Sequence, residues 1–215
     1  MESKRSTSEK DKAVLHVRRV ARRIDPEPGH AFQVCKNALA LFDATSGLHK
    51  LSAADRRLLE SAALLHDTGH TIEFSRHHKH SRDLIMDMEL PGFTRRERRI
   101  IACVARYHRK AHPDAKHAVY CDLSRIERRR VEKLAAILRI ADGLDRCHAA
   151  SCRQIRATTS KTKVAIEVQQ RQPSPVDIWG AQRKQKLFEE VFGVTVTIGA
   201  VADTQSLTRA RTSTQ

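Results

Sequence analysis

The sequence predicts a mainly α-helical protein, in which a helical bundle is followed by a small α+β appendage. Glycine and proline are sparse, at 8 and 6 of 215 residues, and aromatic residues make up only 4%. Leu, Ile, Val and Ala must therefore fill the core, and they recur at helical spacing along most of the chain. Alternating β-branched segments, which are typical of strands, occur only after residue 150.

Four regions are expected from these patterns. They are a disordered, basic N-terminus at 1–10, a helical metal-binding domain at 11–150, a small α+β subdomain at 151–201 and a flexible tail at 202–215.

The N-terminal helices are separated by a clear break. Apolar residues at helical spacing predict a helix over 11–24, and the Pro- and Gly-containing segment 26–29 ends it. A second helix is expected over 30–44. His30 therefore lies at a helix start, where an isolated histidine is most often a capping or surface residue.

The next helix carries the first chemical signal. Ser52 can cap a helix whose apolar face ends directly in the dipeptide His66-Asp67, and Gly69 is expected to let the chain turn sharply there. A basic, histidine-rich segment at 73–82 follows. It leads into another helix, which stops near residue 91.

Two capping boxes open the following helices, at 94–97 and 124–127. The second helix is expected to continue to about Ala149. Asp142 lies beside its buried stripe, where a carboxylate is costly unless it is paired or bound to a metal.

The C-terminal part has a different pattern. Alternating β-branched residues predict strands at 164–168 and 194–198, and 153–158 is a third candidate. A helix is expected between them over 177–192, with Trp179 in the core of the appendage.

Four candidate metal ligands follow from this arrangement: His30, His66, Asp67 and Asp142. Each occupies the end or the buried stripe of a helix. Two imidazoles and two carboxylates suit Mn²⁺, Mg²⁺, Fe²⁺ or Zn²⁺, with open positions for water and a substrate oxygen. The alternative is a hydrogen-bonded structural cluster without metal.

The charge balance favours an anionic partner. Lys plus Arg is 40 and Asp plus Glu is 25, which gives +15 with neutral histidine. A phosphorylated small molecule or polyphosphate fits this surplus, whereas nucleic acid is less favoured because aromatic residues for base stacking are scarce. Five cysteines without CxxC spacing, a charged N-terminus and the lack of a long apolar run predict a cytoplasmic protein without membrane contact.

The motifs together resemble the HD superfamily of metal-dependent phosphohydrolases. More closely, the chain is similar to the C-terminal HD region of exopolyphosphatase/guanosine pentaphosphate phosphatases (Ppx/GppA). The segments that carry the resemblance are 30–34, Ala62–His70, Ser75–Ser81, Ala105–Lys110, Leu138–Arg146 and Leu187–Gly193. They extend over about residues 13–200, which implies an HD-type helical bundle.

The resemblance also implies roles for individual residues. Metal binding falls to His30, His66, Asp67 and Asp142, and Asp67 is also expected to be catalytic. The residues expected to face substrate phosphate are Arg76, His77, Lys79, His80, His108, Arg109 and Lys110. Protonated His70, His80 or His108 could donate a proton to a leaving oxygen.

Two functions remain open on the sequence. The first is a metal-dependent phosphohydrolase that acts on a nucleotide, a polyphosphate or a related anhydride through metal-activated water. The second is a non-catalytic metal- and polyphosphate/nucleotide-binding module. Family members with two domains carry an actin-like half, and no phosphate-cradling glycine loop occurs here. Catalysis is therefore expected from the His-Asp site, or from a partner that supplies that half, and a homodimer is compatible with either function.

Overall fold

The structure is a computed structural model that describes residues 2–201, with side chains from residue 11 onward. The flexible tail expected at 202–215 lies outside the described residues. The first part of the chain is helical: α1 (Glu2–Ile24), α2 (Pro28–Ala44), α3 (Ser46–His49), α4 (Ala53–Leu65), the short 3-10 helix η1 (Thr68–Thr71), α5 (His77–Asp87), α6 (Arg95–Arg106), α7 (Ala118–Cys121) and α8 (Arg125–Gly143).

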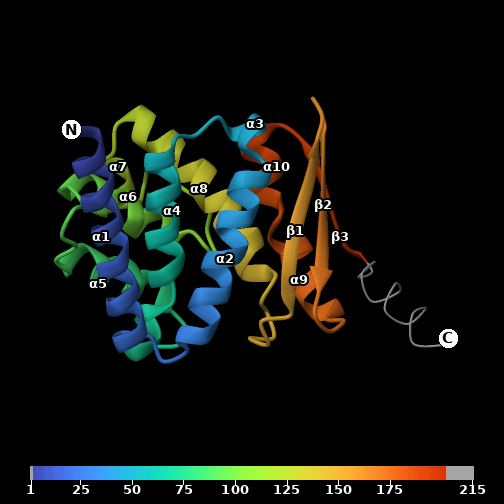
Figure 1. Cartoon of the computed structure of the whole chain (residues 1–215), viewed down its shortest axis with the longest axis horizontal. Coiled ribbons are helices and arrows are strands. Elements are labelled where there is room, and N and C mark those ends of the chain that lie inside the picture. The colour runs from blue at the N-terminus through green and yellow to red at the C-terminus, as the bar shows by residue number, and fades with distance from the viewer. Residues whose placement is uncertain (1, 202–215) are drawn as a thin grey trace.

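Helix α4 lies at the centre of the bundle. It packs against α1, α2, α6 and α8, and its apolar residues Leu58, Leu59, Leu64 and Leu65 are fully buried. Figure 1 shows α2 between α4 and the sheet, so that the bundle and the sheet occupy opposite sides of the molecule. The C-terminal end of α4 therefore lies inside the molecule, close to residues of the other helices.

Capping confirms three predicted helix starts. The side chains of Ser52, Thr94 and Ser124 each accept a hydrogen bond from the backbone N–H three residues later. The acidic residue at that third position accepts in return from the cap backbone N–H, which completes a capping box. Two donors at each helix start are thereby satisfied.

Two helix boundaries differ from the expected ones. Helix α1 includes residues 2–10, which the sequence analysis expected to be disordered. Helix α8 ends at Gly143, six residues before the expected Ala149. Asp145 stabilises the turn that follows, because its carboxylate accepts a hydrogen bond from the N–H of Ala150 at 2.8 Å. This early end turns Asp145 back toward the bundle.

The appendage follows as β1 (Cys152–Thr159), β2 (Lys163–Gln170), α9 (Pro175–Lys184), α10 (Lys186–Phe192) and β3 (Thr195–Val201). The strand order is β1-β2-β3, with β1–β2 antiparallel and β2–β3 parallel. The connection through α9 and α10 supplies the crossover that a parallel pair requires. Strand β1 packs on α2, and α9 packs on α8, which joins the appendage to the bundle.

The expected helix over 177–192 is two helices, and Trp179 is not a core residue. Trp179 is 52% exposed, whereas Ala181 and Phe188 are fully buried. The inner face of α9 passes close to α8, because a Cβ on Gly180 would lie 2.7 Å from the carbonyl oxygen of Gly143. Trp179 lies on the outer face, where the Arg183 Cζ atom is 5.3 Å from the centroid of its ring. The size and hydrophobicity of Trp179 predicted a core position, but these properties do not determine which face of α9 is buried.

We expect Trp179→Ala to change the free energy of unfolding by less than about 1 kcal/mol, because the side chain leaves no enclosed cavity. Chemical denaturation of the two proteins measures the difference. A loss of several kcal/mol would mean that the indole is buried in solution.

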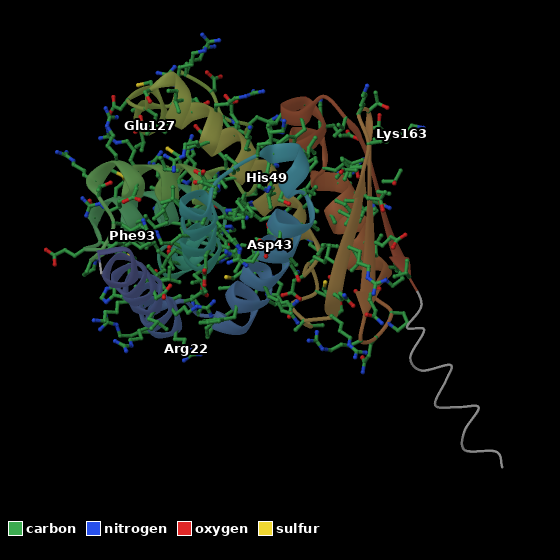
Figure 2. All side chains as sticks on the ribbon, turned by 45° about the horizontal axis from the view of Figure 1, so that its top comes forward. Arg22, Asp43, His49, Phe93, Glu127 and Lys163 are labelled. Atoms are coloured by element: carbon green, nitrogen blue, oxygen red, sulfur yellow. The ribbon has the colours of Figure 1, made fainter. Side chains whose placement is uncertain are left out.

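The basic surplus lies mostly on the outside. Figure 2 shows nitrogen-bearing side chains projecting from the outer surfaces of the helices and the sheet. Several are paired with carboxylates, such as Arg56 with Asp43 at 2.8 Å. Among the described residues, no helix is both long enough and apolar enough to cross a membrane.

Candidate metal centre

The ends of α2, α4 and α8 meet at one buried point. His30 lies in the first turn of α2, His66 caps the end of α4, Asp67 follows it, and Asp142 lies in the last turn of α8. His30 Nε2 lies 3.5 Å from Asp142 Oδ1 and 3.7 Å from Asp67 Oδ2, and all four residues are buried. The structure thus brings together the four ligands that the sequence predicts.

Three further histidines surround Asp67. His77 Nε2 and His108 Nε2 lie 3.2 and 3.4 Å from Asp67 Oδ1, and His70 Nε2 lies 3.5 Å from Asp67 Oδ2. His77 and His108 were expected to face substrate phosphate. Both line a cavity that opens onto this point, where they are buried beside the carboxylate, at the start of α5 and just after the end of α6. The sequence could have indicated this role, because His77 and His108, like the predicted ligands, lie at the ends of helices.

The orientation of the imidazoles is fixed by their second ring nitrogen. His66, His77 and His108 each place Nδ1 on the carbonyl oxygen three residues earlier: His66 on Ala63 at 2.8 Å, His77 on Phe74 at 2.8 Å and His108 on Ala105 at 2.6 Å. His30 Nδ1 lies 2.8 Å from Asp145 Oδ2. In a neutral imidazole, an Nδ1–H that donates to oxygen leaves the Nε2 lone pair facing the cluster that these histidines form with Asp67 and Asp142, as in many metal-binding histidines.

Several cluster atoms have no hydrogen-bond partner. His66 Nε2 and Asp67 Oδ1 are buried and make no hydrogen bond. His77 Nε2 lies 3.3 Å from His108 Nε2, and the two Nε2 lone pairs face each other when both Nδ1–H groups donate to their carbonyl oxygens. Arg109 Nη1 lies 3.1 Å from His77 Nε2. An unsatisfied buried polar atom costs about 1–3 kcal/mol. A bound cation would satisfy these atoms together.

The described residues contain three groups of donor atoms, and within each group the three atoms lie within 4.8 Å of one another. They are His30-His66-Asp67, His66-His108-Asp142 and Asp67-His70-His77. Because Asp67 and His66 are each shared between two groups, the cluster offers donors for more than one cation. Mixed imidazole and carboxylate donors suit Mn²⁺, Fe²⁺ or Zn²⁺.

The carboxylates carry negative charge at the centre. Burial opposes the ionised form of Asp67, but the neighbouring charge of His66 and the close imidazoles of His70 and His77 outweigh it and hold the Asp67 pKa well below its usual value. Burial likewise opposes a charged His30, yet hydrogen bonds to Asp142 and Asp145 raise its pKa to about 10. The cluster therefore attracts a positive charge, whether a proton or a metal ion.

Two residues that the sequence did not single out complete the centre. Asp145 orients His30 from the turn after α8. Lys184, in the last turn of α9, donates to Asp142. Burial opposes the ionised form of Asp142, but the charge of Lys184 helps to hold the Asp142 pKa well below its usual value. No local pattern could have connected Lys184 with a carboxylate 42 residues earlier.

Some predicted residues lie away from the cluster. Arg76 is exposed and pairs with Glu73 at 3.0 Å, and His80 Nε2 lies 3.3 Å from the same carboxylate. Lys79 is also exposed. Arg109 and Lys110, in contrast, line the cavity of about 250 Å³ that opens onto the cluster, together with Arg146 and Lys184.

Comparison with known proteins adds an independent observation. Residues 15–179 match the family model described as Ppx/GppA phosphatase, domain III. Two curated proteins are similar in part, both named guanosine-5'-triphosphate,3'-diphosphate pyrophosphatase. The protein from Photobacterium profundum is 33% identical over 91 residues, and the one from Pseudoalteromonas translucida is 42% identical over 52 residues. These stretches cover 42% and 24% of this chain, but only 18% and 10% of the relatives.

Proposed function

Because the chain belongs to the Ppx/GppA phosphatase domain III family, we propose that it is a metal-dependent phosphohydrolase of the HD superfamily. Its substrate would be a polyanionic phosphorylated compound, such as a nucleotide, a polyphosphate or a related anhydride. The observation that carries the proposal is the Asp67 carboxylate, which faces five imidazole Nε2 atoms at 3.2–3.7 Å.

His30, His66, Asp67 and Asp142 would hold one divalent ion. Asp67 could share a second ion with His77 and His108, whose Nε2 atoms approach it from the other side. A divalent ion at such a site lowers the pKa of bound water and neutralises phosphoryl charge. The donor types suit Mn²⁺, Fe²⁺ and Zn²⁺ better than Mg²⁺, the fourth candidate from the sequence.

The chain's own cations would bind and orient the phosphate. Arg109, Lys110, Arg146 and Lys184 line the cavity over the cluster. Guanidinium and ammonium groups hold phosphate oxygens by charge-assisted hydrogen bonds. Of the three predicted proton donors, His70 and His108 lie beside Asp67, and the His70 side chain is the more exposed, at 20% against 2%. It is therefore the better candidate for protonating a leaving oxygen.

A second function is supported by the length of the relatives. The matched stretches are 18% and 10% of proteins named as pyrophosphatases, so that most of each relative has no counterpart among the aligned residues. The chain would then bind metal and polyphosphate or nucleotide without turnover, and a partner would supply catalysis.

The test is elemental analysis of the purified chain, followed by a panel of phosphate esters and anhydrides with Mn²⁺. The first function predicts bound transition metal and turnover that a chelator removes and Mn²⁺ restores. Full metal occupancy without turnover on any substrate would support the binding module. An absence of metal and of metal affinity would contradict both.

Lys184 offers a separate test of phosphate contact. We expect Lys184→Met to lower kcat/KM about 10- to 100-fold, because one charge-assisted hydrogen bond to phosphate is lost. Metal affinity should not weaken, since the Lys184 ammonium competes with the metal for Asp142. Lys186→Met is the matched control, because Lys186 is exposed and lies near Glu190. Loss of metal together with activity would instead assign Lys184 a role in holding Asp142.

A further inference from the structure

A second cavity lies next to the metal centre and is strongly basic. Its volume is about 370 Å³, and its cationic lining residues are Arg76, Lys79, Arg106, Arg109 and Lys110. No carboxylate is found among its described lining residues. A cavity with this charge repels cations and attracts anions.

Arg106 is the most unusual residue of this cavity. It lies at the end of α6, is only 7% exposed and forms no ion pair within residues 11–201. Its Nε and Nη1 atoms make no hydrogen bond, and no other described side chain has two such buried atoms. A guanidinium normally sits buried only when an anion or carbonyl oxygens compensate it. Its fork matches the oxygens of a phosphoryl group.

His78 adds a second unsatisfied group. It lies on α5, is 7% exposed, and its Nδ1 atom makes no hydrogen bond. His117, also in the lining, has its pKa lowered by burial and then by the charge of Arg106. The field in this cavity is therefore positive, and two of its lining residues, Arg106 and His78, have polar atoms without a hydrogen-bond partner.

Arg109 and Lys110 connect this cavity with the metal centre, since both residues line both spaces. Arg109 Nη1 lies 3.1 Å from Nε2 and 3.2 Å from Nδ1 of His77, so that the guanidinium rests against a cluster imidazole. A ligand that carries several linked phosphates could contact both cavities through these two side chains.

We propose that the Arg106 cavity is an oxyanion site that binds a phosphoryl group of the substrate beyond the one at the metal centre. The identity of that substrate rests on the proposed function, but the anion site itself does not. Compounds with two or more linked phosphates should therefore bind better than monophosphate esters.

Titration calorimetry of the full chain with inorganic tripolyphosphate tests the site. We expect Arg106→Met to raise the Kd about 10- to 100-fold, because charge-assisted hydrogen bonds are lost. Arg95→Met is the matched control: it removes the same charge from an exposed position of the same helix and should change the Kd less than about 3-fold. Arg106→Met should also keep or raise Tm in phosphate-free buffer, because it removes an unpaired buried charge.

Lys79→Met provides a variant that does not disturb the interior, since Lys79 is exposed and lines the same cavity. We expect it to weaken tripolyphosphate binding by about 3- to 10-fold. Equal effects of Lys79→Met and Arg95→Met would overturn the proposal. So would unchanged binding to Arg106→Met, or a fall in its Tm without phosphate, which would mean a structural Arg106.

Turnover separates this inference from the proposed function. Arg106-dependent tripolyphosphate binding in a chain without phosphatase activity would support the anion site while the enzyme proposal fails. Phosphatase activity whose KM for tripolyphosphate does not change in Arg106→Met would support the enzyme and overturn the anion site. With both proposals correct, Arg106→Met raises KM for tripolyphosphate by a larger factor than KM for p-nitrophenyl phosphate.

Discussion

Asp67→Asn should weaken divalent-metal binding by at least about 100-fold, because even residues behind a metal ligand contribute 10- to 100-fold. Asp67 is shared by two of the three donor groups and lies within 3.7 Å of five imidazole nitrogens. The amide keeps the shape of the side chain but removes the charge that attracts the ion. Phosphatase activity should fall with metal occupancy, as measured by elemental analysis and by assay with Mn²⁺.

Asp43→Asn is the control for this substitution, because Asp43 is an exposed carboxylate paired with Arg56. It should leave metal content and activity unchanged. A thermal unfolding curve establishes that the Asp67 variant is folded. If folded Asp67→Asn bound metal as the unchanged chain does, the cluster would be a structural hydrogen-bond network and the enzyme proposal would fail.

Gly69→Ala should destabilise the fold by about 3 kcal/mol or more, at or above the upper end for overpacking a core. A Cβ at this position would lie 2.2 Å from the carbonyl oxygen of His77 and 2.5 Å from the backbone nitrogen of Ser81. Both are backbone atoms of α5, so that the helix must move away. The Gly69 N–H donates to Ser81 Oγ at 2.9 Å, and this contact would be lost as well.

The displacement should also reach the metal centre, because α5 carries His77. Denaturant unfolding measures the stability change, and metal stoichiometry measures the effect on the cluster. Gly47→Ala is the control, since a Cβ there meets nothing within 4 Å and α3 should be unaffected or slightly stabilised. A Gly69→Ala protein with unchanged stability and metal content would mean that α5 does not pack so closely in solution.

This explanation of Gly69 replaces the one suggested by the sequence. A sharp turn after His66-Asp67 was expected to need glycine for its backbone conformation. The described glycines with positive φ are Gly92 and Gly193 instead. Gly69 is required because α5 passes over it, which only the contact between two distant segments reveals.

Local signals in the sequence were sufficient for most helices. Capping residues at Ser52, Thr94 and Ser124 mark the helix starts, because the bonds they make lie within one turn. They were not sufficient for the end of α8, because the chain turns there to bring Asp145 to His30, 115 residues earlier. Nor could they decide which face of α9 is buried, so that Trp179 was assigned to the core although it is half exposed.

The sequence by itself determined the helical architecture and the four candidate ligands at positions 30, 66, 67 and 142, because periodicity, caps and helix-end histidines are short-range features. Only the tertiary structure decided that His77 and His108 lie beside those candidate ligands, that Lys184 reaches Asp142, and that Arg106 is buried without an ion-pair partner among the described residues. The physical reason is that these relations depend on how helices pack across the bundle. Packing is set by the shapes of surfaces far apart in the chain, which no local pattern records.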